Sequence, residues 1–265
     1  MPAVNLLSPR TEASATPVAQ PLLDAARALS STLSALRFAP PIAHVYDPLQ
    51  YAWAPYEAYV RRYGATRKRV VLLGMNPGPF GMMQTGVPFG EVAAVRDWMG
   101  IQAPVARPAS EHAKRPIEGF ACPRSEVSGR RLWGWAALRF GSAEAFFGDW
   151  FVLNYCPLVF LEASGRNFTP DKLPAAERRA VVDACDRHLA AAIAALQPEW
   201  AIGIGGFAER CLRSVLEGDH IESALARRIR VAQILHPSPA SPAANRGWSE
   251  AVDLTLAKLG LAPAR

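Results

Sequence analysis

Four short runs of apolar residues, each ending in a polar residue and a turn, are spaced along the chain. The first, KRVVLLGMNPG, begins at Lys68, and the others are DWFVLNYCPL at 149–158, EWAIGIGGFAE at 199–209 and RVAQILHPSP at 230–239. Apolar runs of this length, rich in Leu and β-branched residues and followed by Gly or Pro, are typical of buried strands. The pattern therefore predicts four strands.

Apolar residues at helical intervals precede the first strand and separate the later ones. They occur at 21–36 and at 55–64, where Gly64 ends the pattern, and again at 173–196 and 207–218. Strands that alternate with helices predict an α/β fold in which four strands form a largely parallel sheet. In such a sheet, ligands bind beyond the carboxyl ends of the strands.

The chain of 265 residues is long enough for one α/β domain with a sizeable core. We predict a single domain at 21–262 and a flexible leader at 1–20, because the leader is rich in Ala, Ser, Thr and Pro and lacks hydrophobic periodicity. The segment 100–131 is irregular, Pro-rich and basic. Its length indicates a functional surface loop rather than a simple connection.

The chain is basic, with a formal net charge of +6 and an isoelectric point near 9.4. An excess of Lys and Arg favours polyanionic partners such as nucleic acid, although many basic proteins bind none. No stretch approaches the roughly 20 apolar residues of a membrane span, and the start of the chain lacks a signal-peptide pattern. We expect a cytoplasmic protein, associated with the nucleoid in a bacterium or nuclear in a eukaryote.

The four cysteines, Cys122, Cys156, Cys185 and Cys211, lie far apart and form no C-x-x-C pair. Zinc sites and iron–sulfur clusters usually draw their ligands from close spacings, so the pattern favours reduced thiols and no metal. A cluster assembled from four distant cysteines stays open at this point.

Four candidate site positions stand where the predicted strands end, at Asn76, Asn154, Gly206 and His236. Asn76 belongs to GMNPGPFGMMQTGVPFGE at 74–91, where five glycines and three prolines fix a tight backbone path. This segment lacks the Lys of a phosphate-binding loop, which argues against nucleoside triphosphates. A structural turn is the alternative role for Asn76.

His236 opens HPSPASPAANRGW, where two Pro-containing turns stiffen the loop after the last strand. Alone, a His at a strand end is more often structural, but its pairing with Asn76 favours catalysis. Asn154 lies in LNYCPL, and its amide offers one donor and one acceptor that match the N3–H and O4 of uracil but not cytosine. Capping a turn is the alternative for Asn154.

These segments together closely resemble the single-strand-selective monofunctional uracil-DNA glycosylase family, within the uracil-DNA glycosylase superfamily. The resemblance spans Phe38 to Leu259 and includes CPRSEVSGRRLWGW at 122–135, SGRNFTPDKL after LNYCPL, and GFAERCLR. It implies a three-layer α/β/α fold around a four-stranded parallel sheet, a base pocket at the strand ends and no cofactor.

The resemblance also implies roles for single residues. Asn76 would position the attacking water and His236 would donate to O2 of the base, while Phe89 would stack on the ring and Gly78 would leave room at C5. The implied substrate-binding residues are Met75, Gly78, Phe80, Phe89 and Asn154. The implied DNA-binding residues are Ser164, Gly165, Arg166, Asn167, Lys172, Ser238, Ala240, Asn245 and Arg246.

The implied activity is removal of uracil and related bases, such as 5-hydroxymethyluracil, from single- and double-stranded DNA, with xanthine and hypoxanthine left open. Lys172 is the only lysine in these motifs, so we expect hydrolysis to an abasic site without lyase cleavage, by a monomer without an obligatory protein partner. Vertebrate members carry Arg after HPSP, but this chain has Ala240, with Arg246 six residues further on. We therefore expect weak wedging into duplex DNA.

Two other functions compete with this interpretation. A non-catalytic nucleic-acid-binding protein could keep both the basic surface and the base pocket. An α/β hydrolase acting on a small molecule is disfavoured, because the chain contains neither a G-x-S-x-G nor an H-E-x-x-H motif.

Overall fold

A computed structural model of the chain describes residues 18–261. Most of the predicted leader lies outside these residues. The first helix, α1 (Ala19–Ser34), begins two residues before the helix that we predict at 21–36, so it takes in the end of the leader. Within residues 18–261, no helix is both long and apolar enough to cross a membrane.

A four-stranded parallel sheet forms the centre of the molecule. Its strands are β3 (Trp150–Asn154), β2 (Val70–Gly74), β6 (Trp200–Ile204) and β7 (Arg230–Ile234), in that order across the sheet. Every residue of the first three is buried, whereas β7 at the edge is partly exposed. The four predicted strands and their parallel arrangement are confirmed.

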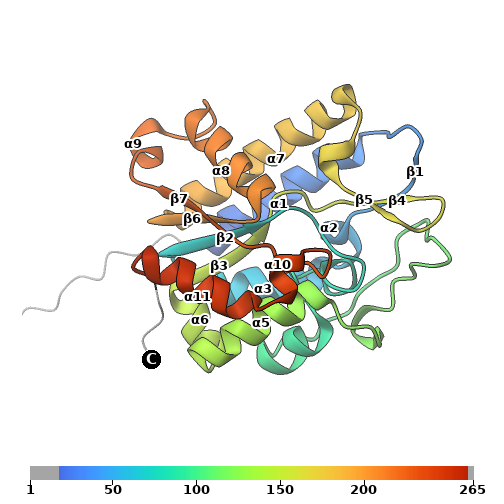
Figure 1. The fold of residues 1–265 in the computed structure, drawn as a ribbon. Coiled ribbons are helices and arrows are strands. Elements are labelled where there is room, and N and C mark those ends of the chain that lie inside the picture. Colours follow the sequence, from blue (N-terminus) through green and yellow to red (C-terminus); the bar gives the residue numbers. More distant parts are fainter. Residues whose placement is uncertain (1–17, 262–265) are drawn as a thin grey trace, which may run out of the picture.

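Helices cover both faces of this sheet, which gives the predicted three layers (Figure 1). On one face lie α1, α7 (Ala175–Leu196) and α8 (Gly206–Glu217). On the other lie α3 (Trp53–Tyr63), α5 (Val127–Phe140), α6 (Ala143–Asp149) and α11 (Trp248–Lys258). The predicted helices at 55–64, 173–196 and 207–218 are thus α3, α7 and α8.

Several single-turn elements complete the chain. They are α2 (Pro48–Tyr51), α4 (Met82–Thr85), a π-helical turn (Ala94–Trp98), two 3₁₀ turns (Gly119–Ala121 and Pro170–Lys172), α9 (Ser223–Ala226) and α10 (Pro242–Asn245). The segment 100–126 contains only the first of the 3₁₀ turns, as the predicted irregular loop requires, but residues 127–131 of that prediction belong to α5 (Val127–Phe140).

A second sheet was not predicted. It is antiparallel and contains β1 (Ile42–Tyr46), β4 (Val159–Glu162) and β5 (Asn167–Phe168) in that order. The strands have only two to five residues, and β4 follows β3 so closely that its apolar residues merge with the run at 149–158. The hairpin of β4 and β5 brings Asn167 back toward the end of β3.

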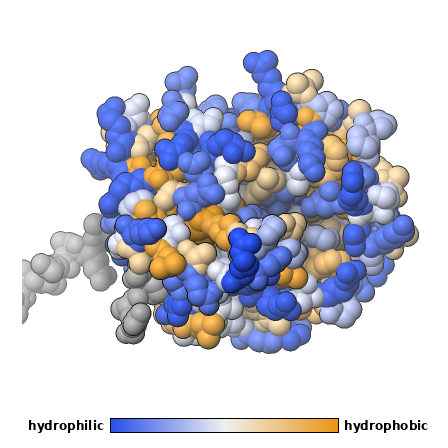
Figure 2. Space-filling model, in the orientation of Figure 1, coloured by the Kyte–Doolittle hydropathy of each residue, from blue (hydrophilic) through white to orange (hydrophobic). Residues whose placement is uncertain are grey.

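The surface is mixed in character. Figure 2 shows hydrophilic residues over most of the visible face, with small apolar patches between them. In the described part of the chain, the large apolar residues that are exposed are Val45, Leu138 and Leu254. The apolar side chains are otherwise concentrated around the main sheet, where aromatic residues of α5, α6 and β3 pack against one another.

His188 of α7 gives the fold a predicted dependence on pH. Its side chain is buried, its Nδ1 has no hydrogen-bond partner among residues 18–261, and burial lowers its pKa from 6.5 to about 4. Below pH 6.5 this imidazole is mostly protonated in the unfolded chain, whereas in the folded chain it stays neutral until the pH approaches 4. Stability is therefore present above pH 6.5 and is lost as the pH falls toward 4.

We expect protonation of this residue to lower the free energy of unfolding by roughly 2 kcal/mol when the pH falls from about 7.5 to about 5. Urea unfolding of the wild type and of His188→Leu at both pH values measures the loss. The variant should lose less stability on acidification, because Leu binds no proton in either state. Equal losses in the two proteins would show that His188 is not the source.

Candidate functional site

A cavity of about 400 Å³ opens at the carboxyl ends of the central strands. Its walls come from the loop after β2, the end of β3, the start of β5, the first turn of α5 and the loop after β7. Parallel strands deliver these segments to one edge of the sheet, as expected for a ligand site in this class of fold. Asn76 and His236, which are 160 positions apart, share this cavity.

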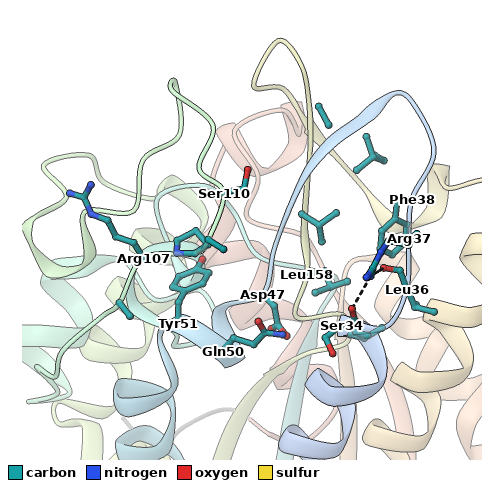
Figure 3. Close-up of a pocket in the computed structure, with 17 residues that line it drawn as sticks. Ser34, Leu36, Arg37, Phe38, Asp47, Gln50, Tyr51, Arg107, Ser110 and Leu158 are labelled. Carbon is teal, nitrogen blue, oxygen red and sulfur yellow. Dashed lines mark hydrogen bonds between the residues drawn. The ribbon is translucent and has the colours of Figure 1, made fainter.

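A larger cavity of about 940 Å³ lies elsewhere, between the end of α1, β1 and the segment 106–110 (Figure 3). Its main polar groups already have structural partners. Arg37 donates to the carbonyl of Ser34, and the Tyr51 hydroxyl donates to the carbonyl of Met83. The smaller cavity is the better candidate because polar atoms without protein partners converge in it.

Glycine at the end of β2 allows two functional side chains to approach the strand. A Cβ atom on Gly74 would lie 2.4 Å from Oδ1 of Asn154 and 2.5 Å from Cε2 of Phe89. No other residue could occupy this position without displacing both side chains. The amide and the aromatic ring are therefore neighbours across the strand end.

Asn76 is anchored through one end of its amide. Its Nδ2 donates to the carbonyl of Leu158 at 3.3 Å, a contact that only the nitrogen end of the amide can make. Oδ1 is left as the acceptor for a small molecule in the cavity. An amide oxygen can orient a water molecule, but it is too weak a base to remove its proton.

Asn154 is buried and incompletely bonded. Its side-chain oxygen has no hydrogen-bond partner in the described part of the chain, and its nitrogen lies 3.3 Å from the weak acceptor Sδ of Met82. Leaving a buried polar group unpaired costs about 1–3 kcal/mol. Such a group in a cavity is prepared for a ligand that supplies both a donor and an acceptor.

Phe89 is held in a backbone conformation that is rare for an aromatic residue, with φ of 54°. The indole N–H of Trp133 donates to its carbonyl at 3.0 Å and fixes it from the core. The ring lines the cavity with its centroid 6.3 Å from that of His236. Backbone strain of this kind is typical of functional sites.

His236 is held as a neutral imidazole with a defined tautomer. The backbone N–H of Ser238 donates to Nδ1 at 3.0 Å, so this nitrogen carries no proton. Burial lowers the pKa of the ring below its ordinary value of 6.5. The remaining proton of the neutral ring must be on Nε2, which can donate into the cavity.

Arg131 of α5 holds the loop that carries His236. Its guanidinium donates to the carbonyl of Pro237 at 3.0 Å and to Oδ1 of Asn245 at 2.8 Å. The nitrogen of Asn245 donates in turn to the carbonyl of Pro239 at 2.9 Å. Asn245, which we predicted to bind DNA, thus has both ends of its amide engaged within the protein.

The structure brings together many of the predicted site residues. Those that line the cavity are Met75, Asn76, Gly78, Phe89, Asn154, Asn167, His236 and Ser238. Phe80, predicted to bind the base, does not line it. Its ring instead lies beneath the guanidinium of Arg124, 4.0 Å from the ring centroid, with Arg115 at 5.5 Å.

The other predicted DNA-binding residues lie outside the cavity. Ser164, Arg166, Lys172, Ala240 and Arg246 are exposed. The exposed guanidinium of Arg166 is paired with Glu162 at 2.6 Å, a contact that solvent weakens.

Gly165 is buried, and its carbonyl accepts from Nε of Arg115 at 2.9 Å. A Cβ atom there would lie 2.9 Å from the ring of His112. Packing against His112 therefore favours glycine at this position. Asn167, by contrast, lies inside the cavity, and its buried Oδ1 has no partner among the described residues.

Four polar residues at the site were not singled out from the sequence: Glu126, Ser128 and Thr169, which line the cavity, and Arg131, which holds the loop of His236. Glu126 accepts from the backbone N–H of Phe80 at 3.3 Å, and burial raises the pKa of its carboxyl. The sequence predicted an irregular loop through residue 131, which gave no reason to place Glu126 in a pocket.

No group of three or more His, Cys, Asp or Glu side chains within residues 18–261 is placed to hold a metal ion. All four cysteines are free, and Cys122, Cys156 and Cys185 are buried.

Comparison with known proteins identifies relatives along nearly the whole chain. The family model of the Uracil DNA glycosylase superfamily matches residues 61–259. The single-strand selective monofunctional uracil DNA glycosylase of Mus musculus is 46% identical over 246 residues, covering 93% of this chain and 86% of the relative. That of Rattus norvegicus is 45% identical over 262 residues, covering 99% and 92%.

Among solved structures, wild-type SMUG2 of Pedobacter heparinus has a similar fold. The TM-score is 0.65 with 18% sequence identity, over 93% of this chain and 98% of that one. At this identity the likeness concerns the fold alone, and it agrees with the predicted α/β arrangement.

We expect ¹⁵N NMR of histidine-labelled protein to find His236 neutral at neutral pH, with its proton on Nε2 and a pKa below 6.5, because burial disfavours the charged ring. The resonance is assigned by its loss in His236→Asn. A proton on Nδ1 of the neutral ring would contradict the hydrogen bond from Ser238, and a pKa above 6.5 would contradict the effect of burial.

Proposed function

Because the chain belongs to the single-strand selective monofunctional uracil-DNA glycosylase family of the Uracil DNA glycosylase superfamily, we propose that its cavity takes up a uracil base flipped out of DNA. The protein is a monofunctional uracil-DNA glycosylase of base excision repair. It hydrolyses the N-glycosidic bond and leaves an abasic site. We propose that it acts as a monomer, in the compartment that holds the DNA.

The hydrogen bond from Ser238 to Nδ1 of His236 is the observation that carries this proposal, because it leaves the proton of the neutral ring on Nε2. As the bond between C1′ and N1 breaks, both electrons leave with the base, and negative charge develops on its O2. A fixed donor in a water-poor cavity stabilises that charge without first having to reorient. A neutral imidazole also avoids the cost of burying a cation when the cavity is empty.

Asn76 acts on the other fragment. Loss of the base leaves an oxocarbenium ion, which a water molecule captures at C1′. We propose that Oδ1 of Asn76 orients this water while Nδ2 remains bonded to Leu158. The proton that the water releases passes to solvent or to the departed uracil anion, because the amide cannot hold it.

Asn154 supplies selectivity for the base. Its unpaired oxygen would accept from N3–H of uracil, and its nitrogen would donate to O4 in exchange for the weak contact to Met82. Cytosine presents an acceptor and a donor in these positions, which leaves both amide ends mismatched unless the amide rotates. A site built this way rejects the wrong base because its buried groups stay unpaired.

We propose that bases with small substituents on C5, such as 5-hydroxymethyluracil, are also substrates. Gly78 carries no side chain at this wall of the cavity, where only its backbone and the carboxyl of Glu126 stand. Xanthine and hypoxanthine share an N–H and C=O edge with uracil, so that edge alone does not exclude them.

Removal of uracil from a single-stranded oligonucleotide, read out by alkaline cleavage at the abasic site, tests the proposal. We expect His236→Ala to lower the single-turnover rate on the order of 10²-fold, because one preorganised donor to developing charge is lost. Asn76→Ala should also suppress the rate, whereas Asn76→Asp keeps an acceptor and should retain more of it.

His44→Ala, which changes a histidine of β1 outside the cavity, is the control for these variants. A wild-type protein that binds the oligonucleotide and never cleaves it would instead be a non-catalytic binding protein. Full activity in His236→Ala or Asn76→Ala would reject the role given to that residue.

The loop after His236 generates a prediction about strandedness. It presents Ala240, which has no side chain long enough to fill the space that an extruded base leaves in the stack. We expect uracil in single strands or mismatches to be removed faster than uracil in a U:A pair. Breaking the U:A pair costs free energy, and no side chain at position 240 fills the space left by the base to offset that cost. Ala240→Arg should raise the U:A rate and leave the single-strand rate unchanged. Equal wild-type rates on both substrates would refute this expectation.

A further inference from the structure

Strand β7 is an edge of the main sheet and has a neighbouring strand only on the side of β6 (Figure 1). On that side, the N–H of Arg230 and the carbonyl of Ile234 each form a 2.9 Å hydrogen bond to a residue flanking β6. Successive residues of a strand direct their backbone groups to opposite edges, so those of Val231 and Gln233 face outward. These outward groups have no hydrogen-bond partner within residues 18–261.

A groove of about 420 Å³ lies beside this open edge, on the face of the sheet that α8 covers. Val231 lines it together with Leu216 of α8 and Ala226 of α9. Gln233 points to the same face, where its Oε1 would lie 3.6 Å from a Cβ atom on Gly206. The unpaired backbone groups and an apolar recess are therefore adjacent.

Unpaired positive charge gathers at the start of the strand. Arg230 points to the face opposite the groove, because neighbouring side chains of a strand alternate, and its guanidinium lies 4.4 Å from the ring centroid of Trp200. Arg227 and Arg228, just before the strand, are exposed. None of these three arginines forms an ion pair in the described part of the chain. The groove itself carries both signs of charge, from Arg213, Glu217, Asp219 and Arg227.

The pattern of unpaired groups indicates which class of partner fits. Val231 and Gln233 present N–H donors and carbonyl acceptors in alternation, which another extended polypeptide can match. A nucleic-acid backbone offers the phosphate oxygens as acceptors and would leave both carbonyls unpaired. A second copy of the chain would bring its own arginines to the same edge, where like charges oppose the pairing.

We propose that the outer edge of β7 binds an extended segment of another protein in which apolar and acidic residues alternate. The segment adds a strand to the sheet. Its apolar side chains enter the groove beside Val231, and its acidic side chains face Arg230 on the other side. Arg230 stands at the amino end of its strand, whereas the base cavity lies at the carboxyl ends, so the inference does not depend on the proposed function.

The probe is a fluorescein-labelled peptide of about nine residues in which Val and Glu alternate, a length typical of a strand. Its Kd for the whole chain is measured by fluorescence anisotropy at low salt. Two further peptides carry methyl groups on the backbone nitrogens of one edge or of the other, so all three have the same charge. We expect one methylated peptide to bind about tenfold more weakly and the other to bind nearly as the parent does, because only one edge pairs with β7.

On the protein side, Gln233→Pro removes an outward N–H and leaves the hydrogen bonds to β6 in place, as proline on an edge strand allows. The Kd of the parent peptide should rise about tenfold. Gln233→Ala is the matched control, because it shortens the same side chain and keeps the N–H, and it should bind as the wild type does. Circular dichroism confirms that both variants are folded.

Arg230→Gln gives a second measurement that leaves the backbone unchanged. Binding should weaken about threefold at low salt and depend less on salt than in the wild type. Arg179→Gln, which changes an exposed arginine of α7, should alter neither property.

Equal effects of methylation on the two edges would reduce the contact to charge attraction and overturn the added strand. Absence of binding to the wild type would overturn it as well. Displacement of the peptide by a uracil-free single-stranded oligonucleotide would assign the edge to nucleic acid instead. A dimer in sedimentation that Gln233→Pro dissociates would assign it to a second copy of the chain.

Discussion

The close approach of backbone and side chains at the end of β2 is the constraint on which the site depends. Gly74 has no room for a Cβ atom, because Asn154 and Phe89 fill that space, and Gly78 has none because of Glu126. The two glycines allow an aromatic wall, a pairing amide and a carboxyl to meet within one cavity of about 400 Å³. A single methyl group at either position would push these groups apart, and a base is recognised by groups set a few ångströms from its ring.

The cavity combines unpaired polar atoms with a strained backbone, and both reduce stability. The side-chain oxygens of Asn154 and Asn167 are buried without partners in the described residues, and Phe89 has a positive φ. The protein offsets these costs with a dense aromatic core, in which residues such as Trp133 and Phe146 are almost completely buried. Groups that are left unsatisfied by the fold are those that a ligand can satisfy, which links recognition to a local loss of stability.

The sequence was sufficient to predict the main sheet, four of the helices that cover it and the meeting of Asn76, Asn154 and His236 in one cavity, whereas α5, α6 and α11 were not predicted. Asn76, Asn154 and His236 follow buried parallel strands, and the geometry of such sheets places their ends together. The second sheet was missed because β5 has two residues and β4 adjoins β3 without a clear break. Phe80, which the resemblance places against the base, does not line the cavity, because a position in a loop does not determine where the ring points. Glu126 is distant in sequence from the strand ends that carry the other site residues. The conformation of the loop at 100–126 brings it next to Gly78, which the sequence does not indicate.

Helix α5 connects the core to three separate walls of the cavity. Glu126 stands at its start, Arg131 holds the loop of His236, and Trp133 holds the carbonyl of Phe89. Because a helix is rigid, any shift of α5 would change the positions of the Phe89 ring, the His236 imidazole and the Glu126 carboxyl together. Directed evolution of base preference should therefore find effective substitutions far from the base, among the large side chains that seat this one helix.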